Sequence, residues 1–217
     1  MQEISYDLGM SEDMRRMRIC ESASILCLAF FGVSIGLLHI LVPQFPPMYR
    51  FMSEYARSPY GPLMTFNFIA LAGAAGFLAI SLSLESRLPQ RSRWVGPPLM
   101  ASASLFLFLM SIFPSDLQET PRTLIGRIHD FFSTLPFACI IPTAILFVRR
   151  FANELSWRTV VRVTILLAVG ALIGAGIAYG WQHSLKWTGL LQRVFALPTL
   201  LWMLIVALRL RSQPDQN

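Results

Sequence analysis

Apolar residues along this chain fall into six blocks of about 20 residues, and no charged residue lies near the centre of any block. At a rise of about 1.5 Å per residue, a helix of this length spans the ~30 Å hydrocarbon core of a bilayer. The expected spans are Ala23–Val42, Gly61–Leu84, Val95–Phe113, Ile128–Val148, Thr159–Trp181 and Leu190–Leu208. The pattern therefore predicts an all-α polytopic membrane protein, built as a bundle of six transmembrane helices.

The composition agrees with this prediction. The 217 residues are 54% apolar and 14% charged, with a mean hydropathy of +0.55, whereas about 25% of the residues in a soluble domain are charged. The segments between the blocks are short, so we expect no separate soluble domain. The expected parts are a cytoplasmic N-terminal segment over residues 1–22, a transmembrane domain over 23–209 and a cytoplasmic tail over 210–217.

Basic residues are distributed unevenly between the two sides of the expected bundle. The side that carries both termini holds twelve of them: Arg15, Arg16, Arg18, Arg87, Arg91, Arg93, Arg149, Arg150, Arg158, Arg162, Arg209 and Arg211. The opposite side holds six: Arg50, Arg57, Arg122, Arg127, Lys186 and Arg193. Because Lys and Arg are enriched in cytoplasmic loops, the sequence predicts a protein of the cell inner (plasma) membrane with both termini in the cytoplasm.

The net charge of +6 comes from these clusters between apolar blocks rather than from a basic soluble module, so we expect no nucleic-acid partner. The chain has three cysteines, an odd number, and all lie in or beside apolar blocks: Cys20, Cys27 and Cys139. Nothing in their spacing indicates a disulfide or a metal site.

Small residues recur at four-residue spacing within several spans. The pairs are Gly32 with Gly36, Ala72 with Gly76, Gly170 with Gly174, and Gly176 with Gly180. Such pairs let helix backbones approach closely, and van der Waals contact then holds the helices together in lipid. We expect these faces to pack within one bundle surrounded by membrane lipids. The same GxxxG faces could instead join two copies in a homo-oligomer or bind another membrane protein.

The first outer loop, Pro43–Pro59, has helical periodicity. Apolar residues recur at i, i+3, i+4 and i+7, namely Met48, Phe51, Met52 and Tyr55, and Arg50, Ser53, Glu54 and Arg57 fall on the other faces. This pattern predicts a short amphipathic helix in the outer interface, which would close the top of the bundle or form a lid or lipid-contacting surface. Later in the chain, Thr120 followed by Pro121 predicts the capped start of the fourth helix.

Polar residues gather near the expected outer ends of the spans. They are His39, Asn67, Asp116, His129, Asp130, Gln192 and Arg193, and His183 falls on the same side. One interpretation is structural: Asp116 pairs with Arg193 or His129 and ties helix ends together, because helix ends at the interface need polar partners. Asn67, Asp130, Gln192 and Arg193 would belong to the same structural cluster.

A second interpretation is an outward-facing site. Asp116, His129 and His39 could bind a metal ion through carboxylate and imidazole ligands, or could act as acid and base on a lipid headgroup. His129 and Ser133 are one helical turn apart, and two imidazoles such as His39 and His129 could also ligate a haem. However, the sequence contains no HExxH, DxD or GxSxG motif. We therefore expect no cofactor, and we favour a protein that is not an enzyme.

Transport of an uncharged or lipid-like substrate is a third interpretation. Ion-coupled transporters place ionisable residues or broken helices near the midplane, and the centres of these spans carry no charge. The expected kinks at Pro136 and Pro142 leave room for a path through the fourth span.

The order of features along the chain resembles the six-span bacterial and archaeal membrane proteins of domain-of-unknown-function family 998 (DUF998). The pieces that carry the resemblance are Met52-Ser53-Glu54, Phe66-Asn67, Phe113-Pro114-Ser115-Asp116, Gly126 with His129, Gly189-Leu190-Leu191-Gln192-Arg193 and Trp202. The resemblance implies the fold from about residue 24 onward but no activity, and it marks Asp116, His129 and Arg193 for testing. Where a second histidine could stand beside the first in such proteins, this chain has Asp130, which weakens a metal hypothesis. We expect an uncharacterised multi-pass membrane protein, lipid-contacting or part of a membrane complex.

Overall fold

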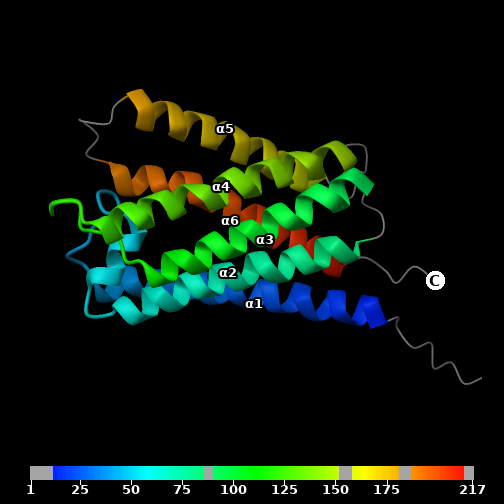
Figure 1. Ribbon diagram of the computed structural model, residues 1–217, viewed down its shortest axis with the longest axis horizontal. Coiled ribbons are helices and arrows are strands. Elements are labelled where there is room, and N and C mark those ends of the chain that lie inside the picture. The colour runs from blue at the N-terminus through cyan, green and yellow to red at the C-terminus, as the bar shows by residue number, and fades with distance from the viewer. Residues whose placement is uncertain (1–11, 86–89, 152–157, 181–186, 213–217) are drawn as a thin grey trace, which may run out of the picture.

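Helices joined by loops make up the part of the chain that the computed structural model describes, and that part contains no strand (Figure 1). The described residues are 12–85, 90–151, 158–180 and 187–212, and the side chains of 90–93, 148–151 and 171–180 lie outside the description. The elements are α1 (Glu12–Leu41), η1 (Met52–Arg57), α2 (Gly61–Leu84), α3 (Gln90–Ile112), α4 (Leu124–Phe151), α5 (Arg158–Gly180) and α6 (Thr188–Arg211). The prediction of an all-α protein is confirmed.

Five of these helices are long and apolar enough to cross a membrane within the described residues, namely α1, α2, α3 from Trp94, α4 up to Phe147, and α6. Their outward faces are apolar, as the stripe formed by Leu26, Val33 and Ile40 on α1 illustrates: each of these side chains is more than two thirds exposed. Lipid is the solvent that suits such a surface. A helix also satisfies its own backbone hydrogen bonds, which hydrocarbon cannot do.

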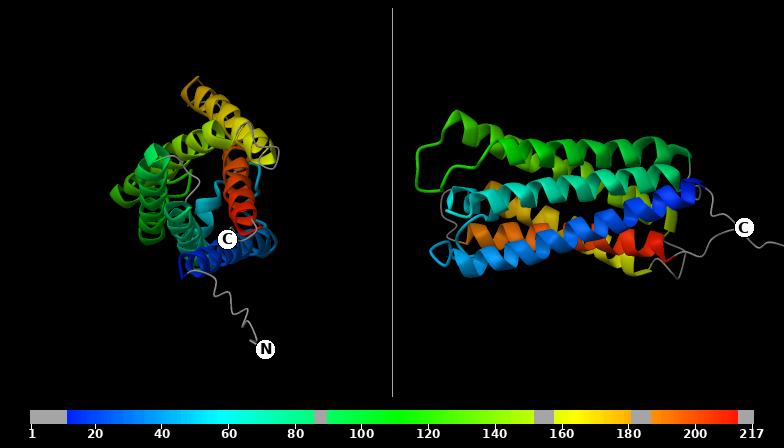
Figure 2. Two further views of the ribbon diagram at one scale, coloured as in Figure 1. Left: turned by 90° about the vertical axis from the view of Figure 1, so that its right-hand side faces the viewer. Right: turned by 90° about the horizontal axis from the view of Figure 1, so that it is seen from below.

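Successive helices lie side by side around the bundle (Figure 2). Each of α2, α3 and α4 packs against the helix before it, α5 packs against α4 and α6, and α6 returns to pack against α1. The beginning of α1 therefore meets the end of α6. Arg18 donates a hydrogen bond to the carbonyl oxygen of Arg211 at 2.9 Å, and Arg211 donates one to the hydroxyl of Ser22 at 2.7 Å.

Small residues on α2 make the close contacts with its two neighbours. A Cβ atom at Gly73 would lie 3.3 Å from the sulfur of Cys27 on α1, and one at Gly76 would lie 3.0 Å from the hydroxyl oxygen of Ser104 on α3. The Ser104 hydroxyl donates to the carbonyl oxygen of Ala72 at 2.7 Å. The small residues at 72 and 76 thus pack inside the bundle, as the sequence predicts.

The glycines of α1 behave differently. Gly32 and Gly36 are exposed, and a Cβ atom at either would meet nothing within 4 Å. The expectation that this GxxxG pair packs within the bundle is wrong, because α1 turns a different face, containing Leu28, Phe31 and Leu38, to the core. A Cβ atom at Gly170 on α5 would also meet nothing within 4 Å, and the other glycine pairs of this helix involve residues outside the described side chains.

Two local expectations at the outer end also differ from the structure. The helix α4 begins at Leu124 rather than after Thr120, whose hydroxyl donates to the carbonyl oxygen of Leu117. The amphipathic segment is a six-residue 3₁₀ helix, η1, that buries Ser53 and Glu54 together with Tyr55. It packs against α2 and α6 and covers the end of the bundle, so it does not lie flat in the interface with its polar face outward.

Candidate functional site

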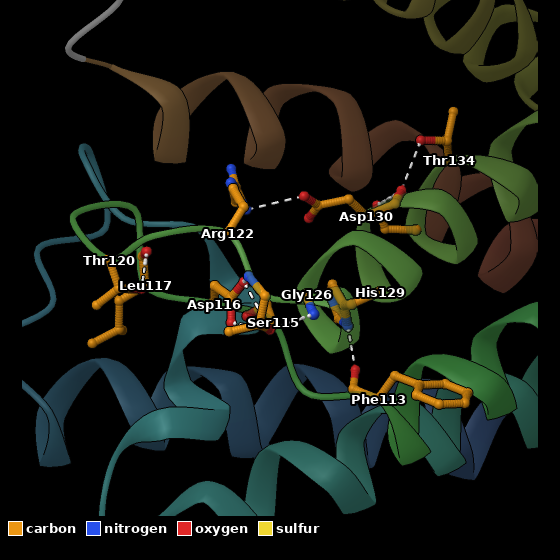
Figure 3. A network of polar contacts seen from close by, with 12 residues as sticks. Phe113, Ser115, Asp116, Leu117, Thr120, Arg122, Gly126, His129, Asp130 and Thr134 are labelled. Carbon is orange, nitrogen blue, oxygen red and sulfur yellow. Dashed lines mark hydrogen bonds and ion pairs between the residues drawn. The ribbon is translucent and has the colours of Figure 1, made fainter.

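The loop between α3 and α4 is organised around the carboxylate of Asp116 (Figure 3). This side chain is 3% exposed. Its Oδ2 accepts a hydrogen bond from the backbone N–H of Thr123 at 2.7 Å, and its Oδ1 accepts one from the Thr123 hydroxyl at 2.9 Å. The Thr123 hydroxyl oxygen in turn accepts the backbone N–H of Gly126 at 3.0 Å. Thr123 is therefore the N-cap of α4, and Asp116 fixes that cap from the loop that follows α3.

Gly126 is required by this arrangement. A Cβ atom at position 126 would overlap the carboxylate group of Asp116. The separation of ten residues between Asp116 and Gly126 in the sequence thus reflects direct contact between a buried carboxylate and the first turn of a helix.

Arg57, at the end of η1, joins this cluster from the first outer loop. Its Nε donates to the carbonyl oxygen of Ser115 at 2.7 Å, and its Nη2 lies 3.4 Å from Oδ1 of Asp116. The backbone N–H of Thr123 is the main group that holds the pKa of Asp116 below its ordinary value, and the Thr123 hydroxyl and the charges of Arg57 and Arg122 act in the same direction. Asp116 is thus kept ionised by the groups that it holds in place.

His129 lies one turn further along α4 and is 2% exposed. Its Nδ1 is 2.7 Å from the carbonyl oxygen of Phe113, which follows directly after α3 and has no partner from the next helical turn. The ring also packs edge-on against Phe68 of α2, with 5.8 Å between the ring centroids. This histidine therefore ties three helices together at the end of the bundle that lies opposite the termini.

The neighbours of His129 on α4 point elsewhere. Asp130 is exposed and forms an ion pair with Arg122 at 3.0 Å. The hydroxyl of Ser133 donates to the carbonyl oxygen of Asp130 at 2.8 Å, so it is engaged with its own helix rather than with the imidazole of His129.

A second cluster is centred on Arg193 of α6. Nη1 of Arg193 donates to the carbonyl oxygens of Pro47, Arg50 and Gly189, at 2.6, 2.9 and 2.9 Å. The Nε and Nη2 atoms lie 3.3 and 3.2 Å from Nε2 of His39. Nδ1 of His39 lies 2.5 Å from the carbonyl oxygen of Ile35, which assigns the proton to Nδ1 and the lone pair that faces the guanidinium to Nε2.

The residues just before Arg193 bind the same loop. The backbone N–H of Met52 donates to the side-chain oxygen of Gln192 at 2.7 Å, and the backbone N–H of Leu190 donates to the carbonyl oxygen of Met48 at 2.9 Å. A Cβ atom at Gly189 would overlap the backbone of Arg50. The segment from Gly189 to Arg193 thus forms the surface of α6 against which the first outer loop packs.

Glu54 is a buried part of this loop, although the sequence pattern placed it away from the apolar face. It is fully buried, accepts the backbone N–H of Phe51 at 3.0 Å and pairs with Arg50 at 3.1 Å. Arg50 also pairs with Glu119 at 2.8 Å, and this hydrogen bond raises the pKa of Arg50. The three-residue spacing from Phe51 to Glu54, in which an acidic residue at N3 reaches back to the N-cap N–H, is the signal that could have revealed this contact.

A family model described as "Protein of unknown function (DUF998)" matches residues 25–209 of this chain. The chain belongs to this family. No curated protein and no solved structure matches it. The family match confirms the resemblance that the short sequence pieces indicated. Both clusters of this DUF998 protein lie within the matched residues.

The candidate residues of the DUF998 protein take separate partners. Asp116 and His129 serve the junction of α3 and α4, whereas His39 contacts Arg193. Asn67 is buried deeper on α2 and bonds to Ser34, with the sulfur of Met64 at 3.9 Å from its amide nitrogen. Among the described residues, no three His, Cys, Asp or Glu side chains form a group that could hold a metal ion. His183 lies outside the described residues, and a catalytic or metal-binding role for Asp116, His129 and His39 stays a prediction.

Proposed function

We propose that this protein acts in the inner membrane without chemistry of its own, as a lipid-contacting or complex-forming component whose outer end is a rigid polar cap. One observation carries this proposal. The buried candidates Asp116 and His129, together with Arg193, form hydrogen bonds with backbone groups of the outer loops. A catalytic group needs a face that is open to substrate, whereas these side chains supply the partners that helix ends and loops require.

We propose six spans, with both termini in the cytoplasm. The contact between Arg18 and Arg211 supports an even number of crossings, because it brings the first and last helices together at one end of the bundle. With α1, α2, α3, α4 and α6 as crossings, α5 supplies the sixth, and its 23 residues correspond to ~34 Å of helix. The excess of arginines at this end supports the cytoplasmic orientation. Reporter fusions at both ends and in the segment between α5 and α6 test it: inside, inside and outside is the expected result.

The alternative is a membrane-embedded enzyme that acts on a lipid headgroup through Asp116 and His129. The two assignments predict opposite effects on stability. If the residues hold the fold, Asp116→Ala and His129→Ala lower the thermal unfolding temperature in detergent, and Asp130→Ala, on the exposed neighbour, changes it little. Active-site residues are commonly held at some cost to stability, so their removal would leave the unfolding temperature unchanged or raise it. That second outcome would favour the enzyme.

A route for a transported substrate through α4 finds less support. The interior-facing residues below Pro136 are all buried, and all but one are apolar: Cys139, Ile140, Thr143, Ala144 and Phe147. Phe147 packs edge-on against the fully buried Trp202 of α6, with ring centroids 6.2 Å apart. Thr143, the polar residue among them, donates to the carbonyl oxygen of Cys139 on its own helix. We therefore do not base the proposed function on transport.

A further inference from the structure

A groove of about 510 Å³ opens on the outside of the bundle where α3 and α4 approach their outer ends. It is lined by Leu109, Phe113, Arg127, Ile128, Phe131 and Phe132. The rings of Phe106 and Phe113 stack on Phe132 with centroids 6.1 and 6.0 Å apart, which gives the groove a rigid aromatic wall. The groove is wide open to the surroundings, so it suits a molecule that lies along the surface of the bundle.

The lining of this groove is almost wholly apolar, so Arg127 contributes the hydrocarbon part of its side chain to the wall. Arg127 is itself exposed, and it is the residue that brings a charge to the groove. The other outer arginines of the described chain are engaged: Arg50 and Arg57 with carboxylates, Arg122 with Asp130, and Arg193 with His39 and loop carbonyls. The guanidinium of Arg127 makes no hydrogen bond and no ion pair with any described residue. A cation without a protein partner at the membrane surface favours an anion from its surroundings.

The order of groups along α4 matches the order of groups in a phospholipid. Arg127 lies in the first turn of the helix, and Phe131 lies one turn, or ~6 Å, deeper. An acyl chain that runs inward from a phosphate at Arg127 would pass the exposed ring of Phe131, which is 62% exposed. The opposite wall, Leu109 and Phe113, is apolar as well, so the groove suits one charged end and one hydrocarbon end.

We propose that this groove is a binding site for an anionic phospholipid, with the phosphate at Arg127 and an acyl chain between α3 and α4. The site rests on the proposed lipid-contacting function and gives it a location and a headgroup preference. Annular lipid makes contact everywhere on the bundle. The preference for negative charge is specific to this position, because Arg127 is the cation that the groove presents.

The test uses the purified full-length protein, delipidated in a mild non-ionic detergent and supplied with phosphatidylglycerol or phosphatidylcholine of identical acyl chains. Native mass spectrometry counts the bound lipids. The wild-type protein is expected to retain more phosphatidylglycerol than phosphatidylcholine. Arg127→Gln should lower the retention of phosphatidylglycerol about fivefold and that of phosphatidylcholine less, because the choline ammonium group already neutralises the phosphate of that lipid. Phe131→Ala should lower the retention of both lipids.

Matched variants separate this site from general lipid contact. Arg122→Gln removes another exposed arginine at this end of the bundle, one that already has a partner, and Phe66→Ala removes an exposed ring near the beginning of α2. Both should bind lipid as the wild type does. Equal retention of the two lipids by the wild type, or equal losses in the matched pairs, would overturn the site. Those results would leave the structural role of Asp116 and His129 intact, since that role is tested by unfolding temperature and not by bound lipid.

Discussion

The carboxylate of Asp116 accepts the backbone N–H of Thr123 at 2.7 Å, so the residue that caps α4 is itself held by a residue from the loop that follows α3. A helix N-cap normally satisfies N–H groups with its own side chain. Here the N-cap also donates two hydrogen bonds, from its backbone N–H and its hydroxyl, to a buried carboxylate seven residues earlier, and these bonds close the loop between the two residues.

Replacement of the cap residue Thr123 should lower the stability of the protein more than replacement of the nearby Thr120. Thr123→Ala removes the hydroxyl that accepts from Gly126 and donates to Asp116, and we expect a loss of about 1 kcal/mol, or about 2–4 °C in unfolding temperature. Thr120→Ala, at the exposed residue that the sequence favoured as the cap, should cause little change. Thermal unfolding of both variants in the same detergent is the measurement. A larger effect at Thr120 would mean that α4 starts earlier than the structure has it.

Acid should weaken the junction of α3 and α4. The pKa of Asp116 is lowered below its ordinary value of 3.8 in the folded protein, so its stabilising contribution is complete above that value. The contribution is lost as the pH falls through the folded pKa, because the protonated side chain can no longer accept all of its bonds. Unfolding temperatures should therefore decline more steeply for the wild type than for Asp116→Asn below about pH 4. Parallel curves would show that Asp116 does not titrate as the hydrogen bonds imply.

Arg193 should hold the first outer loop through the fork shape of its guanidinium. Lysine keeps the charge but cannot reach three carbonyl oxygens and the imidazole of His39 together. In Arg193→Lys we expect the loop to open more often, with faster tryptic cleavage after Arg50 or Arg57 in detergent. Arg122→Lys, which keeps a single exposed ion pair, is the control and should be cleaved at the wild-type rate. Unchanged cleavage in both variants would show that other contacts suffice.

The two kinds of glycine in the bundle should respond differently to a larger residue. Gly76→Val pushes a branched side chain toward Ser104 and should cost about 1–3 kcal/mol by overpacking. Gly32→Val and Gly36→Val point into open space and should leave the stability of the monomer unchanged. Unfolding temperature and light scattering after size-exclusion chromatography report the two effects. If the exposed pair joins two copies, these variants dissociate them; a fall in monomer stability would instead place that face inside a packed bundle.

The sequence predicted the helices that form because a long apolar block must satisfy its own backbone hydrogen bonds in lipid. The bounds Gly61–Leu84 expected for the second span are those of α2, because an uncharged block of this length has one stable arrangement in lipid. Each of the other helices begins before its expected span, and α4 and α6 also end after theirs. For example, α1 begins at Glu12, and its first turns carry the exposed pair of Glu12 and Arg16. Hydrophobicity alone gives no information on such turns in water.

The errors arose where particular polar contacts, and not the hydrophobic pattern, decide the structure. The cap falls on Thr123 because Asp116 and Gly126 form a site for it, which no local pattern around Thr120 could reveal. Glu54 is buried because Arg50 and the Phe51 N–H meet it inside the outer loop. The sequence correctly placed most of these polar residues at one end of the bundle. Their division between two clusters depends on how the helices pack, which the sequence pattern does not show.

The contact between Arg18 and Arg211 has a practical consequence for protein engineering. Since the first and last helices finish beside each other, the end of one copy can be fused to the start of a second with a short flexible linker. Both copies then insert in the same direction, without an additional helix to carry the linker across the bilayer. Such a concatenated pair would allow a single substitution to be placed in one copy of a dimer and not in the other.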